Sequence, residues 1–107
     1  MTVRVGPGND WQDIHQALEG TGTTVVGGRL GEVGVGGYVV GGGLSFLSTQ
    51  YGWAANNIIE FEVVLANASI VTASNTSHPD LYLALKGGGN NYGKICVYKR
   101  HVRRRLT

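Results

Sequence analysis

With 107 residues the chain is at most one small domain, and its 42% hydrophobic content with two prolines is that of a folded protein, not a disordered one. The formal net charge of +2 is unevenly distributed, because residues 1–93 carry a net charge of −4 and the last fourteen residues carry +6. The single cysteine, Cys96, excludes an internal disulfide framework. No apolar stretch is long enough for a membrane span or forms a secretion signal, so we expect no membrane association, and the compartment stays undetermined.

The first part of the chain is expected to form a strand, a helix and a second short strand. Residues 2–6 are rich in β-branched side chains and lead into the turn sequence GPGND. Asp10 is a suitable N-cap for the helix WQDIHQALEG, with Asp13 in the position of a capping box and Gly20 as the end of the helix. The sequence TTVVGG at residues 23–28 predicts the next strand.

Glycine is concentrated between residues 27 and 43, where nine of the chain's 18 glycines fall within seventeen residues. A backbone without Cβ atoms turns sharply and approaches a ligand closely, and successive N–H groups in such turns form concave sites for anions. A linker would contain serine and charge in place of the VGV and YVV of this segment. Glycines that only close tight turns are the alternative, but they account less well for nine in one window. The segment therefore predicts a backbone cradle for a phosphate-bearing cofactor.

The second half of the chain predicts a hairpin and a helix. Residues 44–53 are expected to form a short helix or turn, and residues 58–65 and 69–74 are β-rich runs joined by the short connection Ala-Asn-Ala. Asp80 opens a short helix that Gly87 ends. The order of elements predicts an α+β fold with an antiparallel sheet and flanking helices, without internal repeats.

Several kinds of chemistry are not supported by the motifs present. The glycines match neither a phosphate loop ending in Gly-Lys-Ser/Thr nor a G-x-G-x-x-G dinucleotide fingerprint. His15 and His78 have no second ligand at metal spacing, and Cys96 has no neighbour that would activate its thiol. Ser45 and Ser48 lie in no nucleophile-elbow sequence. Because no acid–base pair is evident either, the sequence predicts binding without catalytic residues.

Three ordered motifs point to one family. They are GEVGVGGYVVGGGLSFLSTQYGWAANN, FEVVLANASIV and PDLYLALKGGGNNYG, and the similarity extends from about Val3 to Gly93. The sequence resembles the FAD-binding domain of the vanillyl-alcohol oxidase / p-cresol methylhydroxylase superfamily, in particular the berberine-bridge-enzyme-like fungal FAD-linked oxidoreductases. The resemblance implies the second, larger part of that domain, in truncated and incomplete form. It also implies FAD as cofactor and, in the intact enzyme, hydride transfer from a small organic substrate to the flavin with reoxidation by oxygen.

The resemblance also implies which residues lie at the cofactor. The backbone of the VGVGG segment is expected to follow the flavin diphosphate and ribityl chain, Gly41 and the glycines after it to close the next turn, and Val63 to lie near the adenine. Tyr38, Trp53 and Tyr92 are further aromatic side chains that could pack against a flavin. The implied cofactor-binding residues are Val33, Gly34, Val35, Gly36, Gly37, Gly42, Gly43, Tyr51, Gly52, Asn56 and Val63, with no catalytic residue and no metal ligand.

The sequence departs from the family pattern at several of these positions. Asn56 replaces an aspartate common among relatives, and Asn67-Ala68 replaces the Asp-Gly of the hairpin turn, which is a weaker turn because alanine disfavours a positive φ. Leu30 stands where relatives with a second covalent flavin bond have a cysteine, and Tyr38 where a histidine is frequent. A cysteinyl flavin link at Leu30 is therefore excluded, and the upstream region that carries the usual histidyl link is not part of this sequence.

The basic C-terminal segment breaks the family pattern. We expect a partial FAD-binding domain over residues 1–93, followed at residues 94–107 by a non-homologous basic tail such as a retained intron or frameshift would produce. The alternative function is a non-catalytic glycine-rich domain whose basic tail binds a polyanion. We do not expect a nucleic-acid partner, and we expect the isolated chain to bind flavin weakly and to be inactive.

Overall fold

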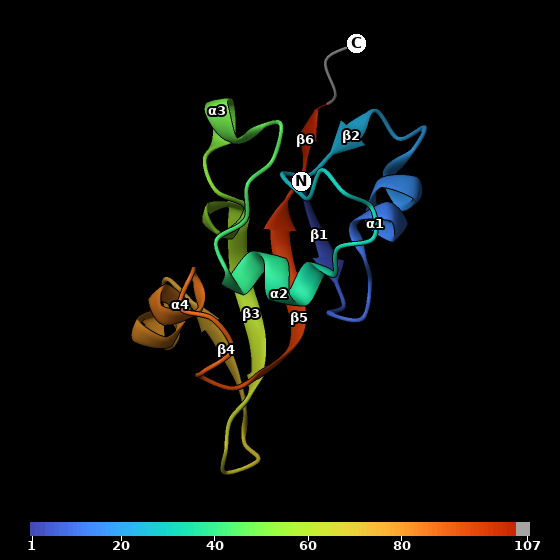
Figure 1. Cartoon of the computed structure of the whole chain (residues 1–107). Helices are drawn as coiled ribbons and strands as arrows, with labels where there is room; N and C mark the ends of the chain where they lie inside the picture. Colours follow the sequence, from blue (N-terminus) through green and yellow to red (C-terminus); the bar gives the residue numbers. More distant parts are fainter. Residues whose placement is uncertain (105–107) are drawn as a thin grey trace.

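A four-stranded antiparallel sheet with the strand order β1-β5-β3-β4 organises the molecule (Figure 1). The structure is a computed structural model, and it describes residues 1–104. A two-stranded sheet of β2 and β6 continues one end of the molecule. The elements in chain order are β1 (Thr2–Val5), α1 (Trp11–Leu18), β2 (Thr23–Thr24), α2 (Val35–Val40), α3 (Ser48–Tyr51), the 3-10 helix η1 (Ala54–Asn57), β3 (Ile58–Val64), β4 (Ile70–Ser74), α4 (Pro79–Leu85), β5 (Lys94–His101) and β6 (Arg103–Arg104).

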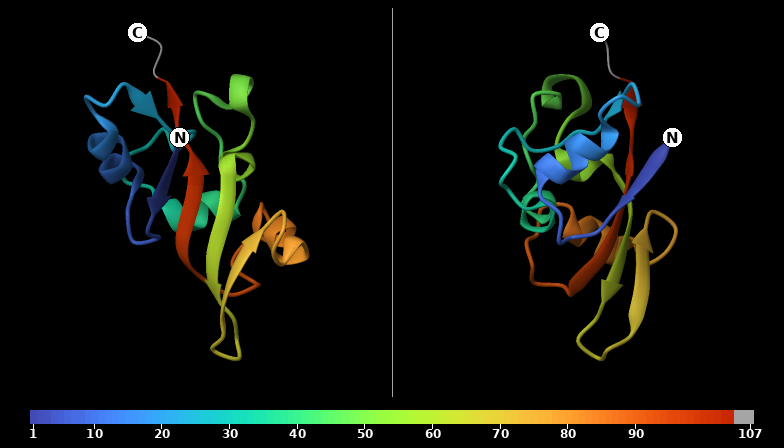
Figure 2. Two further views of the ribbon diagram at one scale, coloured as in Figure 1. Left: turned by 180° about the vertical axis from the view of Figure 1, so that it is seen from behind. Right: turned by 90° about the vertical axis from the view of Figure 1, so that its right-hand side faces the viewer.

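The predicted α+β fold class, with helices beside an antiparallel sheet, is confirmed. Helices α1 and α2 lie on the same face of the sheet, as the edge-on view in Figure 2 shows. Between this face and the helices lies one apolar core that includes Trp11, Phe61 and Tyr98. The opposite face is polar near β1, where the Arg4 guanidinium lies 3.8 Å from the Glu60 carboxylate. Alternation along the strands therefore directs apolar side chains toward the helices and most charges away from them, with the buried Arg100 of β5 as the exception.

The predicted capping box and hairpin are confirmed. The Asp10 carboxylate accepts from the Asp13 N–H at 3.0 Å, and the Asp13 carboxylate accepts from the Asp10 N–H at 3.1 Å, at the start of α1. Strands β3 and β4 pair in antiparallel register from Glu60–Ser74 to Val64–Ile70. In the connection, Ala68 has a φ of +68°, the conformation that made alanine an unfavourable turn residue.

The glycine-rich segment, for which the sequence predicts a backbone cradle, contains a helix. Residues Val35–Val40 form the helix α2, although two of its six residues are glycines of low helix propensity. Val35, Val39 and Val40 are buried in the core, and this burial of apolar side chains stabilises the helix. The expected strand over residues 23–28 is reduced to Thr23–Thr24.

The sequence predicts that the domain ends at residue 93 and that a tail follows it. In the structure, the segment after residue 93 is instead part of the sheet. Strand β5 lies between β1 and β3, so residues from Lys94 to His101 contribute the second strand of the sheet. Ile95, Tyr98 and Arg100 are buried on it. The basic residues obscured an alternation that becomes visible only when both neighbouring strands are in place. Arg105 lies outside the described residues, and the non-homologous origin of residues 94–107 stays a prediction.

Candidate functional site

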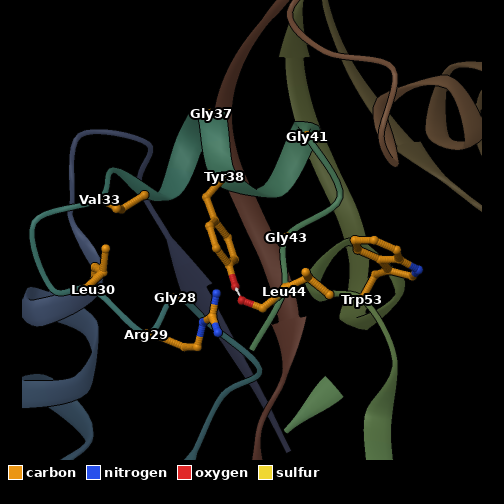
Figure 3. A pocket seen from close by; sticks show the side chains of 10 residues that line it. All are labelled: Gly28, Arg29, Leu30, Val33, Gly37, Tyr38, Gly41, Gly43, Leu44 and Trp53. Carbon is orange, nitrogen blue, oxygen red and sulfur yellow. Dashed lines mark hydrogen bonds between the residues drawn. The ribbon is translucent and has the colours of Figure 1, made fainter. Parts of the chain in front are cut away.

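A hollow with a volume of about 410 Å³ lies beside α2 (Figure 3). The loop after β2 forms one wall, α2 forms the floor, and the segment that leads to η1 forms the other wall. We call it the main hollow. Its lining residues are Gly28, Arg29, Leu30, Val33, Gly37, Tyr38, Gly41, Gly43, Leu44 and Trp53.

Two smaller hollows adjoin the main hollow along α2. The second hollow, of about 290 Å³, lies between α2 and the start of β5, and Gly36, Gly37, Asn90 and Lys94 are among its lining residues. The third hollow, of about 240 Å³, lies beyond the end of α2. It is lined by Gly41, Gly42, Trp53, Ala55, Asn56, Lys86 and Gly87. Because Gly37 lines the first two hollows and Gly41 lines the first and third, the glycines of α2 and its C-cap connect a continuous surface for an extended ligand.

Some glycines near these hollows are required by the packing of the chain itself. A Cβ atom on Gly27 or Gly28 would lie 2.3 Å from the ring of Trp11, which is fully buried against this segment. At Gly43 the φ is +77°, and a Cβ atom would lie 2.4 Å from the ring of Tyr38. These positions therefore need no ligand to explain their glycines.

Gly34 and Gly37 are different, because no neighbouring atom excludes a side chain at either position. A Cβ atom on either residue would have no other atom within 4 Å, and neither residue has a positive φ. Both are exposed on the surface of the segment, Gly34 as the N-cap of α2 and Gly37 inside the helix. A glycine inside a helix costs roughly 0.5–1 kcal/mol relative to alanine. The open space above them is consistent with a ligand that approaches the α2 backbone.

Aromatic and apolar side chains form the walls of the main hollow. Tyr38 packs edge-on against Trp11 at a centroid distance of 4.9 Å, and its hydroxyl donates to the Leu44 carbonyl oxygen (Figure 3). Burial raises the pKa of Tyr38, against the opposing charges of Arg100 and Arg29. Trp53 stands 49% exposed at the opposite wall. Exposed aromatic surface of this kind suits a planar ring of a ligand.

The charges around the hollows are of one sign. Arg29 lines the main hollow, Lys94 the second and Lys86 the third, and none of the residues that line these three hollows is an aspartate or glutamate. This is the reverse of the net negative charge of residues 1–93. A cation beside each hollow and a bare glycine backbone suit an anionic group such as a diphosphate.

The structure brings most of the predicted cofactor residues to this surface, but not all. Val33, Gly37 and Gly43 line the main hollow, Gly36 lines the second, and Gly42 and Asn56 line the third. Gly34 lies exposed at the start of α2.

Four predicted residues lie away from the hollow linings. The side chains of Val35 and Val63 are fully buried in the core and point away from the hollows, and neither residue lines one. Tyr51 is the last residue of α3 and Gly52 is its C-cap, and both precede Trp53 in the chain. Neither residue lines any of the three hollows.

Sequence reasoning missed the cations and the apolar walls. Arg29, Leu44, Lys86 and Lys94 gave no local signal, since only the fold brings them beside α2. Tyr38 and Trp53 were expected near a flavin, and both line the main hollow, whereas Tyr92 lines none of these three.

The isolated histidines make ordinary structural contacts. His15 Nε2 lies 3.2 Å from the Gly28 carbonyl oxygen, and His78 Nδ1 lies 3.2 Å from the Thr72 carbonyl oxygen. Within residues 1–104, no group of three His, Cys, Asp or Glu side chains is arranged to hold a metal ion. Nor does any helix described in this range combine the length and apolar character that a membrane crossing requires.

The bare α2 backbone, the aromatic walls and the cations beside the hollows have the chemistry that suits a nucleotide cofactor. A family model described as an FAD binding domain matches residues 1–74. The chain belongs to this family, which confirms the resemblance to vanillyl-alcohol-oxidase-type flavoproteins and FAD as the cofactor.

Similar proteins agree with this assignment. An uncharacterized FAD-linked oxidoreductase of Arthroderma benhamiae is 57% identical over 98 residues, which is 92% of this chain and 20% of the relative. The FAD-dependent monooxygenase tpcD of Cochliobolus heterostrophus is 58% identical over 100 residues, 94% of this chain and 19% of that protein. The crystal structure of the VAO-type flavoprotein MtVAO615 from Myceliophthora thermophila C1 matches with a TM-score of 0.92 and 38% identity, over 96% of this chain and 19% of that one. The chain thus spans about a fifth of the length of these proteins.

Proposed function

We propose that the glycines of α2 and the three hollows around it form one side of the FAD site of an oxidoreductase. The observation that carries this proposal is the pair Gly34 and Gly37, whose missing side chains no contact within the chain explains. The backbone of α2 would follow the chain of the cofactor, with Arg29, Lys86 and Lys94 near its negative charges. Tyr38 and Trp53 would offer apolar surface to its planar ring.

The reaction proposed is oxidation of a small organic substrate. Bound FAD would supply the hydride acceptor for such an oxidation, and oxygen would reoxidise it. The contribution of this chain is binding and orientation. Tyr38, the ionisable hydroxyl of the main hollow, has a raised pKa and donates to Leu44, so it stays protonated near neutral pH. None of the residues that line the three hollows is an aspartate, glutamate or histidine, so we expect the 107-residue protein to turn over no substrate. Because it supplies one side of the proposed site, we expect it to bind FAD weakly.

The proposal is tested by FAD titration of two variants at Gly37. Gly37→Ala raises stability by about 0.5–1 kcal/mol, because alanine is the better helix residue and its Cβ meets no other atom. The same methyl group occupies the space for the cofactor, so we expect the dissociation constant for FAD to rise about tenfold, and further for Gly37→Leu. Quenching of flavin fluorescence measures binding, and urea unfolding measures stability.

Ala17→Leu is the matched control, since it enlarges an exposed position of α1 that lines none of the hollows. It should leave FAD affinity unchanged. Equal FAD affinity of the wild type, Gly37→Ala and Gly37→Leu would refute the proposed site.

A further inference from the structure

We infer that Arg103 is a positioning residue for the wall of the main hollow that Trp53 forms, an inference that rests on the proposed function. Arg103 lies on β6, in the basic segment that sequence analysis sets apart from the FAD-binding domain. It lines none of the three hollows, so it acts through other residues.

Asn57 is the link between Arg103 and this wall. The Arg103 guanidinium donates from Nη2 to the Asn57 side-chain oxygen at 2.8 Å. The Asn57 amide nitrogen donates to the carbonyl oxygens of Tyr51 and Trp53, at 3.1 and 2.9 Å. Asn57 is only 1% exposed, so water does not compete for these bonds. One amide group thus joins the guanidinium to both ends of the segment Tyr51–Trp53.

Arg103 also contacts the same segment directly. Its guanidinium carbon lies 4.4 Å from the centre of the Tyr51 ring, a cation–π arrangement. A planar guanidinium can stack on the ring and donate to an amide oxygen at the same time, whereas a lysine ammonium is a point charge that cannot stack as a plane. Tyr51, a predicted cofactor residue, therefore packs against Arg103 two residues before Trp53.

Arg103 connects the two walls of the main hollow through the small sheet. In that sheet Arg103 pairs with Thr24 of β2, and the chain continues from β2 to Gly28 and Arg29 in the opposite wall. The wall that contains Trp53 is also bonded to the glycines after α2, because the Ala54 and Ala55 N–H groups donate to Gly43 and Gly42 at 2.9 Å. Loss of the Arg103 contacts should therefore loosen one wall relative to the other without removing any group that lines the hollow.

Hydrogen exchange of the full chain tests this inference without depending on FAD. In Arg103→Met, exchange of the Ala54 and Ala55 amides should accelerate about tenfold, while the β3 amides of Phe61 and Val63 keep their protection. Arg103→Lys should restore part of the protection through a bond to Asn57. Tyr51→Leu, which removes only the stacking, should give a smaller acceleration and provides a second variant if Arg103→Met does not fold.

Arg4→Gln is the matched control, because Arg4 lies on the polar face of the sheet and pairs only with Glu60 among the described ion pairs. It should change exchange at neither place. Equal acceleration at Ala54 and Phe61 would mean a general loss of stability and would overturn the inference, as would unchanged exchange at Ala54.

FAD titration of the same variants connects the positioning role to the site. Arg103→Met should weaken FAD binding about fivefold, with Arg103→Lys in between and Arg4→Gln unchanged. If the wild type binds no FAD, the proposed function fails, while the exchange experiment still decides whether Arg103 holds the wall. Local exchange changes with unchanged FAD affinity would overturn the positioning role.

Discussion

Arg100 occupies an inward-facing position of β5 where the alternation of the strand places an apolar side chain. It is fully buried, its Nη2 donates to the Val26 carbonyl oxygen, and its guanidinium carbon lies 5.0 Å from the centre of the Trp11 ring. The Nε and Nη1 atoms have no hydrogen-bond partner in the described structure. Burial lowers the pKa of Arg100 to about 10, against the opposing influence of Tyr38, so the side chain is still charged at neutral pH. A buried charge with two unsatisfied donors destabilises the fold.

Arg100→Met should therefore stabilise the protein. The unbranched apolar side chain fills a similar volume and removes the buried charge, and these gains exceed the loss of the bond to Val26. We expect the free energy of unfolding in urea at pH 7 to rise by about 1 kcal/mol. The control is Lys99→Met on the neighbouring, less buried position, which should change stability by less than about 0.5 kcal/mol. A loss of more than about 1 kcal/mol in Arg100→Met would show that the bond to Val26 outweighs the buried charge.

At the scale of the elements, local signals and packing had different weight in different segments. Helix α1 begins where its capping box is encoded, and its Trp11 and Ile14 side chains are buried. Helix α2 has no side-chain cap and contains two glycines, so it depends on the core contacts of its valines. The β3–β4 hairpin pairs well, but its connection contains a strained residue, Ala68.

Ala68→Gly should stabilise the hairpin. Glycine adopts the φ of +68° without the steric penalty that alanine has there, which is worth about 1 kcal/mol. The control is Ala66→Gly in the same connection. Its φ is not positive, so the added freedom of the unfolded chain should cost roughly 0.4–1 kcal/mol. Thermal unfolding of the two variants should shift in opposite directions, and a shift in the same direction would exclude strain at Ala68.

At the scale of the whole molecule, Tyr98 couples the sheet to α2. The ring is 1% exposed and packs against Phe61, and the hydroxyl donates to the Gly36 carbonyl oxygen at 3.0 Å. Burial raises the pKa of Tyr98 from 10.0 to about 12. Because the unfolded chain loses this proton at lower pH than the folded chain, the contribution of Tyr98 to stability is complete below pH 10 and is lost as the pH rises toward 12.

Alkaline unfolding should therefore be less steep in Tyr98→Phe. This variant lacks the bond to Gly36 and should be about 1 kcal/mol less stable at pH 8. Between pH 10 and 12 its urea midpoint should fall less than that of the wild type. Tyr38 and Tyr82 act in the same direction and Arg100 in the opposite one, so the difference between the two proteins isolates Tyr98. Parallel pH profiles would contradict the assignment, and tyrosinate absorbance gives an independent measure.

The sequence by itself determined the features that neighbouring residues encode. The capping box at Asp10, the hairpin and the helix after His78 depend on side chains a few residues apart, and the ordered glycine motifs identified the FAD-binding family. The glycine motifs also predicted Gly37 and Gly43 as cofactor-binding residues, and both line the main hollow.

Tertiary structure decided what depends on distant contacts. Helix α2 forms because its valines reach a core supplied by the sheet, and β5 becomes the second strand only between β1 and β3. The side chain of Val63 is buried in the core, whereas the family resemblance predicted that Val63 lies at the cofactor. The cations that surround the hollows and the Arg103–Asn57 contact join residues far apart in the chain. No spacing rule encodes such contacts, because burial and pairing are properties of the assembled fold.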